Sequence, residues 1–242
     1  AAQARIDTCL ALRARLDEQE RLIDELRGAQ RLRENFFAIA SHDLKHPLSS
    51  IRLAGHLLRE NIAGSDSCEL LDEIESALDT MQEIVHDYLD TVALQSGALE
   101  LCIEPMNVED VLWEAVVQHA VAAQKKSITV QIASAEGQVM ADQRRLGQAV
   151  GNLLSNALKY APAHTIVTLR GVTIGRRMHI SVQDQGPGIP QAERSRLFRQ
   201  FGKTSVRPTA GESSTGLGLW IVEQLVTLQN GRVGLDCPPD GG

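Results

Sequence analysis

The sequence predicts an α+β protein with more than one domain, in which a long helical hairpin that dimerises into a four-helix bundle precedes an α/β sandwich. Two observations predict this fold class. Apolar residues recur at intervals of three and four through most of the first 95 residues, as amphipathic helices require. Beyond Ser96-Gly97 the pattern changes to short alternating segments that are interleaved with helical ones. We therefore expect a coiled-coil helix at 1–33, a helical hairpin at 34–96 and a sandwich domain at 97–242.

Composition limits the kinds of partner, the cellular location and the cysteine chemistry that this protein can have. The formal net charge is −7, so the composition does not supply the basic surface that nucleic-acid binding requires. There is no run of 18 apolar residues and no export signal, so we expect no membrane contact from this sequence and a cytoplasmic location, with a membrane-anchored or a soluble parent protein as the alternatives for a longer chain. The four cysteines are widely separated and have no matching histidine spacing, which predicts neither a zinc site nor a disulfide framework.

The helical region is predicted to associate with a second copy of itself. Residues 1–33 favour a coiled coil, although Gln19 and Gln30 interrupt the seam and a single exposed helix is the alternative. The next helix should end near Gly64, a suitable C-terminal cap. The helix after it carries an unbroken apolar stripe, formed by Leu71, Ile74, Leu78, Met81, Val85, Tyr88 and Val92. One hairpin cannot bury the stripes of both its helices, so we expect a homodimer.

A candidate nucleophile lies in the first helix of the hairpin. His42 is followed directly by Asp43, and Pro47 removes the N–H that would bond the carbonyl of Asp43, so the helix should bend there. A neutral imidazole has a lone pair that can attack an electrophile, and an adjacent carboxylate can take or orient the proton on the other ring nitrogen. His42 and Asp43 therefore form a candidate catalytic pair; the alternative is an ordinary surface pair on a helix.

The second domain is predicted to be a mixed sheet with helices on one face, because its strands and helices interleave without a regular βαβ repeat. Helices should begin after Asn107, in a pattern that resembles a capping box, after Asp142 and at Leu217. We expect the middle helix to run through Tyr160 with a core-facing stripe of Leu146, Val150, Leu153 and Ala157. The predicted strands span residues 127–133, 138–140, 165–173, 178–183 and 231–236.

One face of the middle helix is polar in a way that suits a nucleotide. Asn152, Asn156, Lys159 and Tyr160 follow one another at helical spacing along that face. Amide oxygens can coordinate a hard cation such as Mg²⁺, and a lysine can neutralise phosphate charge. A solvated polar face is the alternative when this helix is considered alone.

Two glycine-rich segments strengthen the nucleotide interpretation. Asp184 comes directly after a predicted strand and is followed by Gly186 and Gly188. Its carboxylate can accept a hydrogen bond from an exocyclic amine. The two glycines permit close approach of the backbone to a ligand or a positive φ. The segment GESSTGLGL at 211–219 then leads into a helix N-terminus, where free N–H groups favour phosphate. For either segment alone, a turn is the simpler explanation.

Together these motifs resemble those of sensor histidine kinases of two-component systems. FFAIASHDLKHPLSSI at 36–51 is similar to the H-box of that family, NLLSNALKY at 152–160 to its N-box, DQGPGIP at 184–190 to its first glycine box, LFRQF at 197–201 to its F-box and GLGL at 216–219 to its second glycine box. The resemblance implies an ATP-binding domain of the gyrase and histidine-kinase type, with ATP and Mg²⁺ as cofactors. It also implies phosphorylation of a histidine from ATP, followed by transfer to an aspartate in the receiver domain of a response regulator.

The resemblance further implies roles for individual residues. His42 would be the phosphoacceptor with Asp43 as its acid–base partner, and Asn156 would bind Mg²⁺. The residues implied to contact the nucleotide are Asn152, Asn156, Lys159, Tyr160, Asp184, Gly186, Gly188, Lys203, Thr215, Gly216, Leu217 and Gly218. Among them Lys159 would meet phosphate, Asp184 would bind adenine and Lys203 would reach the γ-phosphate. Residues 202–215 would form a lid over ATP.

The sequence departs from the family pattern at His46, where a threonine or asparagine is usual four residues after the phosphoacceptor. That position is implied to hold water for dephosphorylation of the regulator, so we expect phosphatase activity that is weak or pH-sensitive, unless His46 only caps the kink at Pro47. The main rival function is a hydrolytic ATPase of the gyrase and mismatch-repair superfamily. Such enzymes carry a water-activating glutamate where this chain has Asn152, which disfavours hydrolysis. The second rival is an inactive dimeric scaffold, which would fail to bind ATP.

Overall fold

The computed structural model describes residues 13, 18–19, 21, 48–49, 51–55, 67–95, 99–209, 212 and 214–237. It contains two compact units, Ala1–Ile84 and Val85–Gly242. The predicted helix end near Gly64 and the bend at Pro47 lie outside the described residues. Within the described ranges, none of the helices combines the length and the apolar character needed to cross a lipid bilayer.

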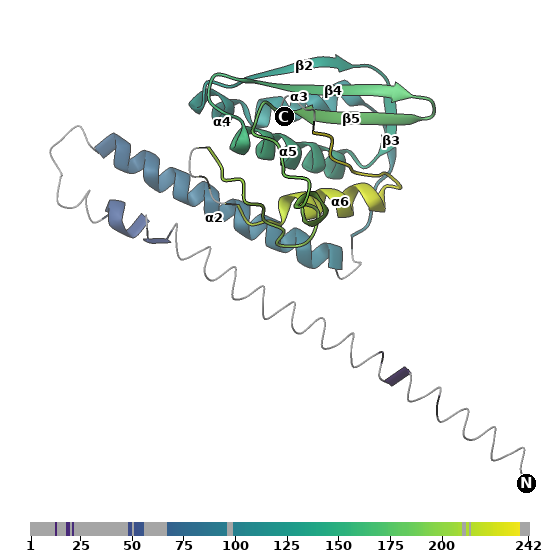
Figure 1. Ribbon diagram of the computed structural model, residues 1–242, viewed down its shortest axis with the longest axis horizontal. Coiled ribbons are helices and arrows are strands. Elements are labelled where there is room, and N and C mark those ends of the chain that lie inside the picture. The colour runs from purple at the N-terminus through teal and green to yellow at the C-terminus, as the bar shows by residue number, and fades with distance from the viewer. Residues whose placement is uncertain are drawn as a thin grey trace, which may run out of the picture. The chain divides into compact units, whose positions relative to one another are not determined.

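Helix α2 spans Ser67–Gln95 and confirms the predicted second helix of the hairpin (Figure 1). Its apolar positions differ in exposure. Ala77 and Ile84 are buried, whereas large apolar side chains at every seventh residue are exposed by 45–51%, namely Leu71, Leu78, Val85 and Val92. An apolar row that repeats at this interval along a helix is typical of the seam of a helical bundle.

The sandwich domain is built on a mixed three-stranded sheet, as predicted. Its strands are β2 (Thr129–Ala135), β4 (Ile166–Ile174) and β5 (Arg177–Gln183), in the order β2-β4-β5. Strands β2 and β4 are parallel, and strands β4 and β5 are antiparallel. The β4–β5 turn contains Gly175 at φ 64°, a conformation that glycine adopts without steric cost. A separate antiparallel ribbon joins β1 (Glu104–Asn107) to β3 (Gln138–Ala141).

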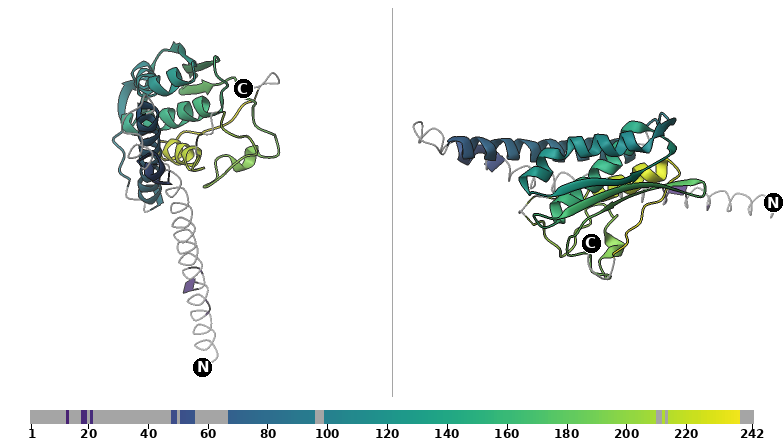
Figure 2. Two further views of the ribbon diagram at one scale, coloured as in Figure 1. Left: turned by 90° about the vertical axis from the view of Figure 1, so that its left-hand side faces the viewer. Right: turned by 90° about the horizontal axis from the view of Figure 1, so that it is seen from above.

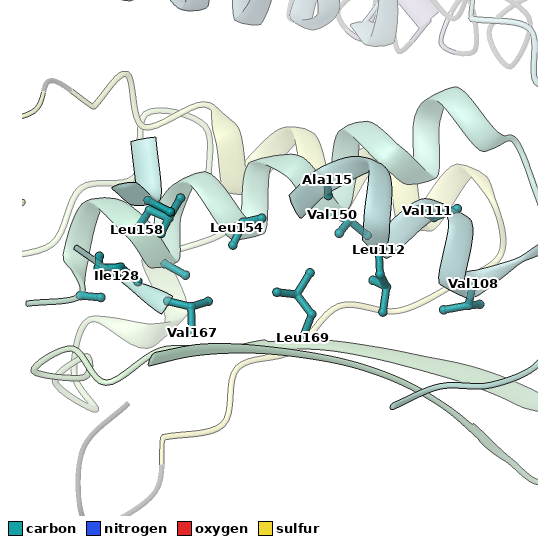
Figure 3. Packing of buried hydrophobic residues seen from close by; sticks show 13 residues of the cluster. Val108, Val111, Leu112, Ala115, Ile128, Val150, Leu154, Leu158, Val167 and Leu169 are labelled. Carbon is teal, nitrogen blue, oxygen red and sulfur yellow. The ribbon is translucent and has the colours of Figure 1, made fainter. Parts of the chain in front are cut away.

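The helices of this domain cover one face of the sheet. Helix α3 spans Val108–Gln118, α4 spans Ala120–Lys125, α5 spans Gln143–Tyr160 and α6 spans Gly218–Leu228. Figure 3 shows the core between the helices and the strands, with Leu112, Leu154 and Leu169 at 0% exposure. Helix α6 lies beside α5 (Figures 1 and 2). Burial of the apolar side chains of this core favours the assembly of the domain.

Two helix starts were predicted from capping residues, and their caps differ. Asp142 caps α5 as expected, because its Oδ1 accepts from the N–H of Arg145 at 3.0 Å. Its Oδ2 also accepts from the N–H of Cys102 at 2.9 Å. Asn107 occupies the N-cap of α3, but its side chain makes no capping bond. The side chain of Asn107 instead donates to Asp110 and accepts from Gln138, so the expected capping box does not form.

Two further expectations about local structure need correction, and two elements were missed. The predicted strand at 231–236 is absent: these residues leave α6 through a turn, in which the N–H of Gly231 donates to the carbonyl of Val226 at 2.8 Å. The backbone of these residues pairs with neither outer strand of the described sheet, β2 or β5, and Leu235 remains 40% exposed. The buried stripe of α5 contains Leu154 at 0% exposure rather than Leu153, which is half-buried. Strand β1, which contains Pro105, and the short helix α4 were not predicted.

Candidate nucleotide-binding site

The C-terminal half of α5 carries the polar residues that suggested a nucleotide. Asn152, Asn156, Lys159 and Tyr160 are all half-buried, whereas Leu154 and Leu158 on the same turns are buried in the core. Helix α5 is thus anchored by one face while its polar side chains remain partly accessible. This division follows from the 3.6-residue period, which separates the two sets around the helix.

The start of α6 lies against this polar face of α5. The side-chain Nδ2 of Asn152 donates to the carbonyl of Gly218 at 3.3 Å, although the two residues are 66 positions apart in the sequence. A Cβ atom at Gly218 would lie 4.0 Å from that amide nitrogen. The structure therefore brings the two predicted motifs, NLLSNALKY and GLGL, into direct contact.

The first glycine box lies at the C-terminal end of the same helix. Asp184 follows β5, and its Oδ1 accepts from the N–H of Gly186 at 2.7 Å. A Cβ atom at Gly186 would lie 2.7 Å from that oxygen and 3.1 Å from the carbonyl oxygen of Tyr160, so glycine is required by close approach. Gly188 adopts φ 66°, a conformation that disfavours other residues. Asp184, which is half-buried, therefore stands close to the last turn of α5.

The predicted lid begins and ends at one place. Gly216 has φ 71°, and a Cβ atom there would lie 3.0 Å from the carbonyl carbon of Phe201. Beyond it, Leu217, Ile221 and Leu225 form a buried cluster against which Phe201 packs. The LFRQF and GLGL motifs thus meet, and the segment between them leaves and returns to the same edge of the domain.

Two described residues of the predicted lid are hydrogen-bonded to carboxylates outside it. The N–H of Ser205 donates to Oε2 of Glu193 at 2.7 Å, and hydrogen bonds from the backbone and side chain of Ser205 lower the pKa of Glu193. The hydroxyl of Thr215 donates to Oδ2 of Asp87 at 2.7 Å and accepts from the N–H of Leu217 at 3.2 Å. Lys203 is exposed.

Other parts of the described structure offer less to a nucleotide. A cavity of about 220 Å³ lies at the β1–β3 ribbon, lined by Pro105, Met106, Asn107, Asp110, Val111, Gln138 and Gln143, and it includes none of the predicted nucleotide residues. The described residues also contain no cluster of three histidine, cysteine or carboxylate side chains that could hold a metal ion.

Some predicted site residues lie outside the described residues, and some contacts of the site were not predicted. His42, Asp43 and His46 belong to the first group, so their roles stay predictions. Asp87, Glu193, Lys126 and Thr209 belong to the second group. Each contacts a residue far along the chain, such as Asp87 with Thr215, and no local pattern in the sequence marks such a pair.

Two family models match the chain. Residues 141–242 match the model described as histidine kinase-, DNA gyrase B- and HSP90-like ATPase. Residues 32–97 match the His Kinase A phosphoacceptor domain. The two matches contain the predicted phosphoacceptor and all of the predicted nucleotide-binding residues.

Curated relatives align with nearly the whole chain. Sensor histidine kinase GacS of Pseudomonas protegens is 29% identical over 221 residues, which cover 88% of this chain and 24% of that protein. Sensor protein CreC of Escherichia coli is 31% identical over 218 residues, which cover 90% of this chain and 45% of that protein. The chain thus spans less than half the length of these two relatives.

Solved structures share the fold. The Acinetobacter baumannii histidine kinase AdeS has a TM-score of 0.59 at 19% identity, with 77% of this chain and 86% of that chain covered. Full-length ShkA, solved in complex with AMPPNP, has a TM-score of 0.56 at 27% identity, with 81% of this chain and 41% of that chain covered.

Proposed function

Because this chain belongs to the sensor histidine kinases of two-component systems, we propose that it transfers the γ-phosphoryl group of ATP to His42 and then to an aspartate in the receiver domain of a response regulator. The observation that carries this proposal is the meeting of three distant motifs around α5. Asn152 contacts Gly218, and the carbonyl of Tyr160 lies close to Gly186. A polar helix face is thereby enclosed between two glycine-rich segments, as phosphate and base recognition require.

ATP would be held by groups at both ends of this polar face. Asp184 has an oxygen that can accept from the exocyclic amine of adenine, and the ring of Tyr160 would pack against the base. Lys159 and the backbone N–H groups at the start of α6 suit phosphates, because the helix N-terminus carries partial positive charge. The related ShkA was crystallised with the ATP analogue AMPPNP, which supports a nucleotide here.

Phosphoryl transfer to His42 needs a neutral imidazole. A ring nitrogen of His42 would form a bond to the γ-phosphorus while the bond from that phosphorus to the β–γ bridging oxygen breaks, and ADP would leave. The carboxylate of Asp43 would take or orient the proton on the other ring nitrogen. The same P–N bond would later break as an aspartate oxygen of the regulator attacks the phosphorus.

Mg²⁺ fits the residues of this site. Asn156 is half-buried on the polar face of α5 and provides an amide oxygen, a ligand type that Mg²⁺ accepts alongside phosphates and water. When bound, the cation would neutralise negative charge on the phosphates. Asn156 would hold it, with Asn152 in the neighbouring turn oriented by its contact with Gly218.

We further propose that the protein acts as a homodimer in the cytoplasm, where ATP and response regulators are available. Support for the dimer comes from Leu71, Leu78, Val85 and Val92, which leave an apolar row exposed along α2. Packing two such rows against each other would remove them from water and complete a four-helix bundle.

The proposal is tested by incubating the protein with γ-labelled ATP and Mg²⁺ and mapping acid-labile label. We expect label on His42, none in His42→Gln, and unchanged ATP affinity in that variant, because the phosphoacceptor and ATP domains are distinct. Asn156→Asp should lose Mg²⁺-dependent labelling while remaining folded. Steady release of inorganic phosphate without protein labelling would instead favour the hydrolytic ATPase.

A further inference from the structure

We propose that Lys126 is a positioning residue for the lid, defined here as residues 202–215, and that it sets where the lid lies over the nucleotide. This inference rests on the proposed ATP-binding function. Lys126 follows α4, far from every motif of the site in the sequence. Its ammonium nevertheless joins the C-terminal end of α5 to two residues of the lid.

The ammonium of Lys126 has four oxygen partners within hydrogen-bonding distance. On α5, Nζ lies 2.6 Å from the carbonyl oxygen of Leu158 and 3.1 Å from that of Lys159. On the lid, it lies 2.6 Å from Oγ1 of Thr209 and 3.0 Å from Oε1 of Glu212. Three N–H donors shared among four oxygens leave the ammonium well solvated by protein, which is required because its side chain is only 14% exposed.

Thr209 is fastened to the same helix end by bonds of its own. Its N–H donates to the carbonyl of Lys159 at 3.0 Å. Its hydroxyl lies 2.9 Å from the carbonyl oxygen of Ala161, to which it can donate while accepting from Lys126. The lid therefore touches α5 through backbone and side chain at one residue, and Lys126 bonds to both sides of that contact.

The position of the ammonium follows from the electrostatics of a helix end. The last carbonyls of a helix have no intrahelical partner and carry partial negative charge, so a cation is favoured beside them. Glu212 brings a full negative charge to the same place, and its side chain is 28% exposed. The ammonium of Lys126 therefore contacts this carboxylate and the helix carbonyls at the same time. Lys126 thus makes it possible for the lid to lie across the end of α5.

The consequence for the nucleotide is geometric. Lys159 and Tyr160, the proposed phosphate and base contacts, belong to the helix turn whose carbonyls Lys126 binds. The ends of the lid are already held where Phe201 meets Gly216. Attachment at Thr209 and Glu212 holds these two residues beside that turn, which reduces the conformational entropy that must be lost when ATP binds.

Amide exchange in the nucleotide-free full chain tests the attachment directly. Lys126→Met keeps the length of the side chain but removes its charge and donors, and we expect exchange at the Thr209 amide to accelerate by about tenfold. Lys125→Met is the matched control, because it removes the same charge from the adjacent, exposed residue. Glu212→Gln should produce a smaller acceleration with an unchanged melting temperature, since it leaves both helix carbonyls bonded to Lys126.

Glu212→Gln also separates lid positioning from simple capping of α5. If Lys126 served only the helix, Glu212→Gln would leave Thr209 exchange at the parental rate, and that result would overturn the proposal. Unchanged exchange in Lys126→Met would overturn it as well. Neither readout needs ATP, so the test remains decisive even if the proposed kinase activity fails.

ATP titration measures the effect on the proposed function. We expect the KM for ATP to rise about fivefold in Lys126→Met with a much smaller change in kcat, because the lid contributes to binding. Lys126→Arg should recover part of the affinity. The exchanged pair Lys126→Glu with Glu212→Lys should not recover it, because a carboxylate at 126 would face the carbonyls of α5. Full recovery by the exchanged pair would show an ordinary ion pair and contradict the inference.

Discussion

Replacement of Gly186 by alanine should weaken ATP binding without unfolding the domain. The new methyl would lie 2.7 Å from Oδ1 of Asp184, and ordinary contact begins at 3.4 Å, so the carboxylate must move by about 0.7 Å (3.4 − 2.7). The carbonyl oxygen of Tyr160, 3.1 Å away, limits movement of the methyl in the other direction. The displaced carboxylate loses its bond from the N–H of Gly186 and, in the proposed complex, its alignment with adenine.

A misaligned hydrogen bond to a charged group costs about 1–2 kcal/mol, which corresponds to an ATP affinity roughly five- to thirtyfold weaker. The loss of affinity is measured by calorimetric titration with ATP and with a purine nucleotide that lacks the exocyclic amine. The parent should prefer ATP, and Gly186→Ala should lose most of that preference. Gly234→Ala is the control, because a Cβ atom there has nothing within 4 Å. If Gly186→Ala bound ATP as tightly as the parent, Asp184 would not be the group that binds adenine.

Three further predictions concern stability and pH. Leu154→Ala should lower the free energy of unfolding, measured by urea denaturation, by about 2–5 kcal/mol because Leu154 is fully buried. Leu153→Ala should lower it less, since Leu153 is only half-buried. The opposite order would contradict the assigned core face of α5. Asp142→Ala should cost about 1–2 kcal/mol through the lost α5 cap, whereas Asp142→Asn, which keeps an accepting oxygen, should cost less; equal losses would argue against capping. The hydrogen bonds from Ser205 place the folded-state pKa of Glu193 below its ordinary value of 4.5, so this contact should be complete above pH 4.5 and be lost as pH falls through the lower folded-state pKa. The chemical shift of the Ser205 amide, followed by NMR from pH 7 to 3, should report that loss and should not change with pH in Glu193→Gln. The same titration in both proteins would refute the assignment of this contact to Glu193.

Much of the fold was predictable because local patterns report what each element buries. The period of apolar residues in α2, the Asp142 cap of α5 and the glycine turn between β4 and β5 each depend on neighbours in the sequence. The nucleotide motifs could also be recognised in the sequence, because their polar residues and glycines lie at fixed spacing on one helix or directly after one strand. The polar face of α5 needed only the 3.6-residue period to be recognised.

The tertiary structure decided which distant segments meet. The alternation at 231–236 is that of a strand, but a strand forms only where its backbone pairs with a neighbour, and these residues make no such pairing in the structure. The choice of Leu154 over Leu153 for the core depends on how α5 is rotated against the sheet and α3, which its own sequence leaves open. Lys126 shows the same limit most clearly. A lysine after a short helix has no local signature, and it becomes a lid contact only because folding places the end of α5, Thr209 and Glu212 around one ammonium.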